Sequence, residues 1–480
     1  MNYRMVFYTV GRVAIAIAAL LLLPLAVSVY FREETFFSFV YTIVFSAVLG
    51  LALTFFLKPK RTTIGAREGF AIVALVWIVM SIIGALPFYI SREIPDFIDA
   101  FFETVSGFTT TGASILTNVE AMSKSLLFWR SFTHWIGGMG VLVFVVALLP
   151  NVADRSIHIL RAEMPGPTVG KLVPRAKTTA RILYVIYIVL TIIEILFLLA
   201  GNMPLFDSAI TAFGTAGTGG FGIKADSIGG YSNYIQWVVA VFMLIFGMNF
   251  NLFYLILLRK IRSVLKNTEL ISYFAIVIIS IGVITSNILS LYDNFADALR
   301  ESAFHVSSII TTTGFAISDF NAWPNLSKAI LLVLMFIGGS AGSTAGGLKV
   351  SRVVILFKTL KNELKKMLRP RSVSVPKMDG REIEKETVSG VSSYFALYML
   401  LFVVMFILIS FEPFGMETNF SAVAACFNNV GPGFAAVGPT ASYAAYTAFS
   451  KIILSFSMLL GRLEIIPLVL AFSPRTWRKD

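Results

Sequence analysis

Apolar residues in this chain fall into long runs that short polar connections separate. A run of about 20 apolar residues is long enough to cross the roughly 30 Å hydrocarbon core of a bilayer as a helix. The runs predicted to span the membrane are 9–30, 36–57, 69–90, 125–150, 180–201, 233–258, 268–292, 326–357, 388–411 and 444–472. The pattern therefore predicts an all-α integral membrane protein.

Four shorter apolar runs each lead into a loop that carries glycine. The expected short helices are 97–108, 206–216, 296–310 and 420–430, and their loops are 109–114, 217–222, 311–316 and 431–435. A helix of about 11 residues is about 16 Å long, so it reaches only halfway across the bilayer core. Each chain segment must then turn back, and its non-helical part must line a wet cavity.

These short helices belong to a unit that recurs four times, as spanning helix, pore helix, loop and spanning helix. The copies are centred on Gly112, Gly220, Gly314 and Gly433. We expect four parallel repeats around a central ion pathway, preceded by a transmembrane hairpin that stands outside the repeat. The predicted divisions are 1–60 for the hairpin, then 61–178, 179–266, 267–387 and 388–480 for the repeats.

Composition agrees with a membrane protein and argues against several other classes. The chain is 57% hydrophobic and 14% charged, with a mean hydropathy of +0.81. The single cysteine, Cys426, excludes internal disulfides and a cysteine-based metal site. The three histidines of the chain are widely scattered, which argues against a haem-bearing helix bundle. The sequence shows no metal-ligand cluster, nucleophile–base pair or phosphate-binding loop, so we expect neither an enzyme nor a bound cofactor.

The net charge of +12 is distributed as in a multi-pass membrane protein. Basic residues gather in 58–67, 155–181, 259–266, 349–381 and 475–479, whereas the other connections are acidic. The positive-inside rule places the basic segments and both termini in the cytoplasm. The expected surroundings are therefore a lipid bilayer, and no nucleic-acid partner is expected.

A cytoplasmic link over 358–387 departs from the membrane composition. Val373, Val375, Asp379-Gly380 and Ile383 favour a small hairpin, because Asp-Gly supplies the positive φ angles of a tight turn. A disordered basic linker is the alternative. The cluster that could dock an acidic or nucleotide-binding regulator comprises Lys358, Lys361, Lys365, Lys366, Arg369 and Arg371.

The four glycine loops have the chemistry of a K⁺ filter. A dehydrated K⁺ needs oxygen ligands, and backbone carbonyls supply a ring of them without fixed charge. Glycine permits the required backbone angles and lets four loops crowd around one axis. The candidate filter residues are Thr110, Thr111, Gly112, Thr218, Gly219, Gly220, Thr312, Thr313, Gly314, Val430, Gly431, Pro432 and Gly433. Potassium enters here as the transported ion.

A glycine-rich stretch interrupts the last span of the third repeat. Its candidate gate residues are Gly338, Gly339, Gly342, Ser343, Thr344, Gly346 and Gly347. So many glycines make a poor helix, which favours an intramembrane loop below the filter; close packing of small residues between helices is the alternative. Arg462, a charge inside the last apolar run, is assigned to the same gate. Pairing with Glu464 or snorkelling are the alternatives for this arginine.

These motifs make the chain resemble the TrkH proteins of the Trk/Ktr/HKT potassium-uptake superfamily. The shared stretches are TTTGAS (109–114), GTGGF (217–221), TTTGF (311–315), NVGPGF (429–434) and IGGSAGSTAGGLKV (337–350). The resemblance implies K⁺ uptake across a bacterial inner membrane, a homodimer with one pore per protomer, and a cytoplasmic nucleotide-binding regulator, TrkA. Gly219 and Pro432 stand where threonine precedes the other two filter glycines, so these loops should offer fewer hydroxyls.

One rival interpretation is an inverted-repeat secondary transporter for another cation or small solute, which also uses broken helices at mid-membrane. The acidic connections and the glycine loops all fall on one side, which favours repeats that run in the same sense. The sequence leaves open whether transport is passive or a symport with H⁺ or Na⁺.

Overall fold

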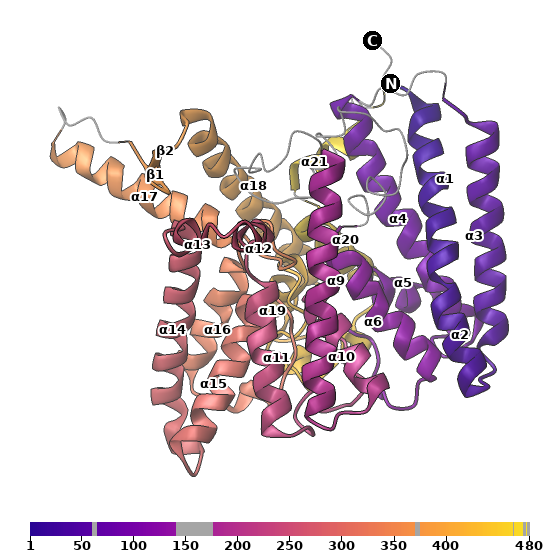
Figure 1. Cartoon of the computed structure of the whole chain (residues 1–480), viewed down its shortest axis with the longest axis horizontal. Coiled ribbons are helices and arrows are strands. Elements are labelled where there is room, and N and C mark those ends of the chain that lie inside the picture. Colours follow the sequence, from indigo (N-terminus) through magenta and orange to yellow (C-terminus); the bar gives the residue numbers. More distant parts are fainter. Residues whose placement is uncertain (60–64, 141–175, 370–374, 464, 474–476, 478–480) are drawn as a thin grey trace.

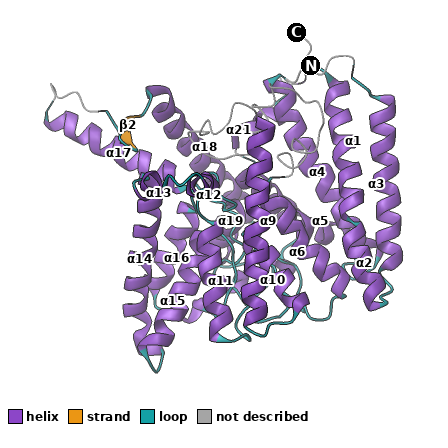
Figure 2. Cartoon of the chain, in the orientation of Figure 1, coloured by secondary structure: helices purple, strands orange, loops and turns teal. Residues whose placement is uncertain are grey.

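The computed structural model describes residues 1–59, 65–140, 176–369, 375–463, 465–473 and 477. These residues are mostly helical, and the long helices run side by side (Figure 1 and Figure 2). Six of the described helices are long and apolar enough to cross a membrane, or seven if one bent pair is a single span. The predicted all-α membrane architecture is confirmed.

The N-terminal hairpin is present as predicted. Its helices are α1 (Tyr3–Leu20), α2 (Leu22–Phe31) and α3 (Phe36–Phe56). Helices α1 and α3 approach closely because Gly11 and Gly50 face each other; a Cβ on Gly50 would lie 2.7 Å from the Gly11 carbonyl oxygen. The Ser46 hydroxyl also donates to the carbonyl oxygen of Ala14 at 2.8 Å.

The four repeats follow in chain order. The first contains α4 (Ala66–Ile90), α5 (Phe97–Phe108) and α6 (Lys124–Gly138). The second contains α9 (Ala176–Ala200), α10 (Leu205–Gly217), α11 (Asn233–Phe246), α12 (Phe250–Leu257) and α13 (Ile261–Leu265). The third contains α14 (Thr268–Ile288), η1 (Leu289–Leu291), α15 (Phe295–Ile310), η2 (Phe320–Ala322), α16 (Asn325–Ile337) and α17 (Val350–Leu368). The fourth contains α18 (Lys385–Ile409), α19 (Met416–Phe427), η3 (Ala435–Val437), η4 (Tyr443–Ala445), α20 (Ala448–Arg462) and α21 (Ile465–Phe472).

The second long helix of each repeat departs from the predicted bounds. In the second repeat the prediction of one helix over 233–258 is wrong, because α11 and α12 meet at an angle of 89°. In the third repeat the predicted interruption within 326–357 is present. In the fourth, α20 ends at Arg462 and α21 begins at Ile465. Residues 141–150 of the predicted first-repeat helix, and Glu464, lie outside the described residues.

The short helices α5 and α15 begin after polar residues whose side chains accept from their first amides, whereas α10 and α19 begin after Pro204 and Gly415 without a side-chain cap. The Asp96 carboxylate accepts from the backbone N–H groups of Ile98 and Asp99, and Asn294 accepts from the N–H of Asp297. Each of the four helices also carries an acidic residue in its first turn. Negative charge is favourable at a helix N-terminus, so the acidic connections fix where these helices start.

The hairpin predicted around Asp379-Gly380 is confirmed. Strands β1 (Lys377–Met378) and β2 (Arg381–Glu382) pair antiparallel on either side of this turn, whose two residues have φ of 51° and 77°. The Asp379 carboxylate accepts from the Thr268 backbone N–H at 2.7 Å, which fastens the hairpin to the start of α14. Val373, which the prediction also used, lies outside the described residues.

Candidate ion pathway

The four short helices end in the same backbone turn. One residue in each turn, the first or second after the helix, has a left-handed φ. The angles are 55° at Thr110, 54° at Thr218, 55° at Thr312 and 56° at Asn429. The next residue then donates its N–H five residues back: Thr111 to Ser106 at 2.9 Å, Gly219 to Gly214, Thr313 to Ser308 and Val430 to Ala425 at 2.8 Å. This is a Schellman turn. A left-handed angle is costly for the β-branched threonine, and such strain is typical of functional sites.

A glycine with positive φ follows each of these turns: Gly112 (82°), Gly220 (77°), Gly314 (83°) and Gly431 (96°). Each glycine lies against a backbone carbonyl of the next loop in chain order. A Cβ placed on it would lie 2.6 Å or less from that oxygen: Gly112 from Gly219, Gly220 from Thr313, Gly314 from Val430 and Gly431 from Thr111. The same contact thus recurs four times and closes a ring in which the last loop meets the first.

This ring corrects the position of the fourth glycine. The sequence predicted a fourth loop centred on Gly433, with Pro432 before it. The residue with the positive φ and the ring contact is Gly431, and the residue before it is Val430. Gly433 instead donates its N–H to the carbonyl oxygen of Val437 at 2.7 Å, so it belongs to the segment that leaves the ring.

Threonine hydroxyls brace the first and third loops in the same manner. Thr111 and Thr313 bond through their hydroxyls to those of Thr109 and Thr311, at 2.8 Å in each loop. The Thr110 hydroxyl oxygen, by contrast, is buried and has no hydrogen-bond partner among the described residues. An unpartnered buried oxygen at this position fits a loop whose remaining ligand is an ion or water.

The second and fourth loops have no hydroxyl at the position directly before the ring glycine, where the first and third loops have Thr111 and Thr313. The reason differs between the two loops. A Cβ on Gly219 would come within 3.0 Å of the imidazole ring of His134, so the ring occupies the space where a side chain would stand. His134 is itself held by the carbonyl oxygen of Gly107, 2.8 Å from its Nδ1. Val430 gives the fourth loop an apolar side chain. The predicted shortage of hydroxyls holds, with Val430 in the place assigned to Pro432.

All four ring glycines line one cavity of about 380 Å³. It lies on the side of the ring where the chain continues after each glycine. Its wall is formed by the segments that follow each glycine, including Ser114, Gly222, Ala316 and Tyr443. The Tyr443 hydroxyl donates to the carbonyl oxygen of Gly431 at 2.8 Å and so holds the fourth loop from this side. The cavity forms a vestibule from which an ion can reach the ring.

The glycine-rich interruption between α16 and α17 forms a loop, residues 338–349, on the opposite side of the ring. It fills the break between α11 and α12. The Ser340 N–H donates to the carbonyl oxygen of Gly247, and the carbonyl oxygen of Gly342 accepts from the Phe250 N–H, both at 3.0 Å. Each interrupted helix therefore supplies partners for backbone groups that the other leaves free, as a buried break in a membrane requires.

The same loop contacts the ring directly. The Gly346 N–H donates to the Thr312 hydroxyl at 2.6 Å. At its outer end, the buried Glu269 carboxylate accepts from the N–H groups of Ala341 at 2.6 Å and Ser351 at 3.2 Å. The loop is thus held between the ring and the first turn of α14.

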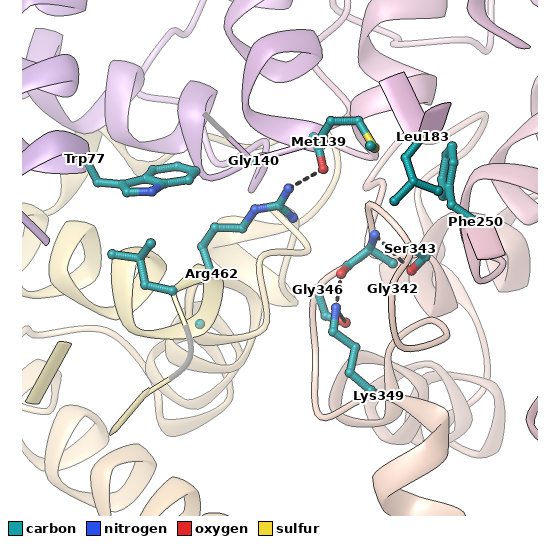
Figure 3. A pocket seen from close by; sticks show the side chains of 14 residues that line it. Trp77, Met139, Gly140, Leu183, Phe250, Gly342, Ser343, Gly346, Lys349 and Arg462 are labelled. Atoms are coloured by element: carbon teal, nitrogen blue, oxygen red, sulfur yellow. Dashed lines mark hydrogen bonds between the residues drawn. The ribbon is translucent and has the colours of Figure 1, made fainter. Parts of the chain in front are cut away.

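Two cationic side chains line a narrow cavity of about 50 Å³ beside this loop (Figure 3). Arg462 donates to the carbonyl oxygens of Thr344 at 2.6 Å, Gly137 at 2.6 Å and Gly138 at 2.7 Å. Lys349 donates to the carbonyl oxygens of Ala345 and Gly346. The arginine was predicted from the sequence and the lysine was not, although the position of Lys349 directly after Gly346-Gly347-Leu348 was a usable signal.

The fold and the ring together define a multi-pass membrane protein with a central path for a cation. Comparison with known proteins gives the family. The family model named TrkH, described as a cation transport protein, matches residues 33–479. The chain belongs to the TrkH family of cation transport proteins.

The most similar relatives agree with this assignment over nearly their full lengths. The "Trk system potassium uptake protein TrkH" of Salmonella typhimurium is 35% identical, covering 100% of both chains. The "Trk system potassium uptake protein TrkG" of Escherichia coli is also 35% identical, covering 95% of this chain and 94% of that one. The crystal structure of the potassium transporter TrkH from Vibrio parahaemolyticus matches with a TM-score of 0.89 and 33% identity, covering 100% of both chains.

Proposed function

We propose that this protein carries K⁺ into a bacterial cell across the cytoplasmic membrane, through the ring of Gly112, Gly220, Gly314 and Gly431. The observation that carries the proposal is the cyclic packing of each ring glycine on the carbonyl of the next loop. Such packing fixes four backbone segments around one axis, where carbonyl oxygens can replace the water shell of an ion. The C-terminal ends of α5, α10, α15 and α19 add partial negative charge at that point, which favours a cation.

All four loops contact the next loop in the same direction around the ring, and this argues against the rival inverted-repeat transporter. The same pair of positions, a glycine and the carbonyl of the residue before the next glycine, meets at all four junctions. A rotation about one axis generates this pattern. Inverted repeats would alternate in direction and could not reproduce it.

Isotope flux into liposomes that contain the purified protein tests the function. With a set membrane potential, ⁴²K⁺ uptake should exceed ²²Na⁺ uptake, and it should vanish in liposomes without protein. Equal entry of both ions would overturn the assignment of K⁺. The same liposomes with an imposed H⁺ or Na⁺ gradient distinguish symport from passive flow, because only a coupled transporter moves K⁺ against its own gradient.

We further propose that the loop 338–349 and Arg462 form the gate. Arg462 holds the loop through Thr344 and joins it to the end of α6, so it closes the path with both a positive charge and backbone. Removing the side chain should free the loop, because glycine-rich backbone changes conformation at small cost. Arg462→Ala, and separately deletion of Gly342–Ala345, should raise K⁺ flux while preserving K⁺ preference. If both variants insert normally and conduct no faster than the parent, the gate lies elsewhere.

The cytoplasmic side of the protein, in this proposal, is the end that carries α13, α17 and the β1–β2 hairpin (Figure 1). These elements lie almost entirely in two of the basic segments, 259–266 and 349–381, which the positive-inside rule places in the cytoplasm together with both termini. Accessibility of single introduced cysteines to a membrane-impermeant reagent tests the orientation. A cysteine at Lys361 should react only from the inside, and one at Asn294 only from the outside.

Helix α17 is the proposed docking site for a nucleotide-binding regulator of the TrkA type, in a homodimer of this chain. Its exposed face combines Lys361, Lys365 and Lys366 with the exposed side chains of Leu364 and Met367. The exposed apolar side chains favour a surface that a partner covers, and the lysines favour an acidic surface on that partner. Reversing the three lysine charges should weaken co-purification with the regulator. Unchanged binding, with normal insertion, would reject this surface; Arg371 of the predicted cluster lies outside the described residues.

A further inference from the structure

A buried ion pair lies behind the first and second loops of the ring. Glu103 is on α5 and Arg130 is on α6, and the Nε of Arg130 is 2.5 Å from Oε1 of Glu103. Both side chains are almost fully buried, with exposures of 1% for Glu103 and 4% for Arg130. Burying two charges is costly unless their remaining hydrogen-bonding groups are also satisfied, so the identity of these further partners matters.

The remaining bonds of Glu103 go to the segment that leaves the first loop. Its Oε1 accepts from the Ser114 hydroxyl and its Oε2 from the Ile115 backbone N–H, both at 2.9 Å. These residues follow Gly112 directly in the chain. The carboxylate therefore ties the outgoing backbone of the first loop back to the middle of its own pore helix.

The remaining contacts of Arg130 go to the segment that leaves the second loop. Its Nη1 donates to the carbonyl oxygen of Gly222 at 3.1 Å, and its guanidinium lies 3.4 Å from the centre of the Phe221 ring. These residues follow Gly220 directly. A planar guanidinium can bond in its plane and stack on its face at the same time, which lysine cannot do.

We propose that Glu103 and Arg130 are positioning residues of the filter: as a pair, they fix the spacing between the first and second loops and so contribute to ion preference. The pair spans the junction at which Gly112 lies against the Gly219 carbonyl. Arg130 also lines the vestibule, where the Glu103 carboxylate offsets its positive charge along the path of an incoming cation. This inference rests on the proposed function, since ion preference has meaning only if the ring conducts.

The test uses Glu103→Gln and Arg130→Lys in the liposome assay. A glutamine at 103 places an N–H₂ group against a donor, either Arg130 or the Ile115 N–H, so either the bond from Arg130 or the bond from the outgoing segment is lost. A lysine at 130 keeps the charge but cannot bond Glu103 and Gly222 while stacking on Phe221. Each variant should lower the K⁺/Na⁺ flux ratio by about tenfold, because breaking a buried pair strands its partner.

A control pair lies on the same helix. Asp99, one turn before Glu103 on α5, bonds Lys451 of α20 at 2.5 Å, and this contact does not touch the segments that leave the ring. Asp99→Asn therefore removes a comparable charge and should leave the flux ratio within about twofold of the parent, as expected for a pair that only joins two helices.

Salt dependence separates the charge effect from a general loss of structure. Glu103→Gln leaves an uncompensated positive charge on the vestibule wall. It should reduce K⁺ flux more in dilute salt than in concentrated salt, because screening shortens from about 30 Å at 0.01 M to about 3 Å at 1 M. A merely structural defect would show no such dependence.

The double replacement Glu103→Leu with Arg130→Met covers the case in which single variants do not fold. Replacing both charges by apolar groups is often tolerated in stability, so this variant should insert. It should still show a reduced flux ratio. If the parent prefers K⁺ and all of these variants keep its ratio, the inference fails and the proposed function stands. If the parent shows no K⁺ preference, the proposed function fails and the inference falls with it.

Discussion

Replacing Gly112 by serine should reduce the preference of this protein for K⁺. Gly112 has a φ of 82°, and a Cβ there would lie 2.6 Å or less from the carbonyl oxygen of Gly219. An ordinary contact between an aliphatic carbon and a carbonyl oxygen is about 3.3–3.6 Å. One of the two loops must therefore move by roughly 1 Å, a distance that matters for a ring of carbonyl ligands around a small ion.

The size of the effect follows from the backbone strain. A left-handed φ angle costs a residue with a Cβ about 1–2 kcal/mol. The loop can relieve this strain by moving out of the ring geometry. Energies of this size correspond to a factor of about 5–30 in population. The expected fall in the K⁺/Na⁺ flux ratio of Gly112→Ser is therefore about 5–30-fold, and Gly314→Ser, with the same geometry, should behave alike.

The assay compares isotope uptake of both ions by liposomes under one membrane potential. Gly282→Ala is the matched control, because Gly282 lies within helix α14 and a Cβ there would meet nothing within 4 Å. This control should match the parent protein in both flux and preference. Unchanged ion preference in both Gly112→Ser and Gly314→Ser, with normal insertion, would refute the reasoning.

Four further substitutions probe individual contacts. Gly431→Ser should lower the K⁺/Na⁺ flux ratio more than Gly433→Ser, because Gly431 has a positive φ and lies against a ring carbonyl, whereas a Cβ on Gly433 would press on Val437 and Ser421 outside the ring; the reverse order would restore Gly433 to the ring. Gly219→Ala should also lower the ratio, since its methyl group would press on the ring of His134; unchanged flux of both ions would show that the imidazole yields freely. Glu269→Ala should raise K⁺ leakage without the regulator, because it removes the oxygen that accepts from the Ala341 amide of the loop and the Ser351 amide of α17, and leakage equal to that of the parent would exclude Glu269 as a clamp.

The local parts of this architecture could be predicted from the sequence. The first pore helix occupies 97–108, as predicted, because Asp96 caps its start and the Thr109–Gly112 turn ends it. The glycine-rich loop between α16 and α17 was also predictable, since a cluster of glycines excludes a stable helix. Both features depend on residues that are neighbours in the chain.

Features that depend on distant contacts were missed. The stretch 247–249 belongs to a strongly apolar run, and its break becomes stable only because the loop 338–349 supplies hydrogen-bond partners. In the fourth loop, Gly431 and Gly433 are equally plausible from sequence. The contact of Gly431 with the Thr111 carbonyl, more than three hundred positions earlier in the printed sequence, distinguishes them, together with the positive φ of Gly431. The pairing of Glu103 with Arg130 was likewise invisible, because no spacing rule links residues on two different helices.

The most direct test of the central claim is to locate the ion itself. Rb⁺ has the charge of K⁺, a similar size and a measurable anomalous X-ray signal. In crystals of the protein grown in RbCl, we expect an anomalous peak on the axis enclosed by Gly112, Gly220, Gly314 and Gly431, and a much weaker occupancy when Na⁺ competes at the same concentration. Anomalous peaks elsewhere in the protein, with none inside this ring, would contradict the claim that the four loops form the cation site.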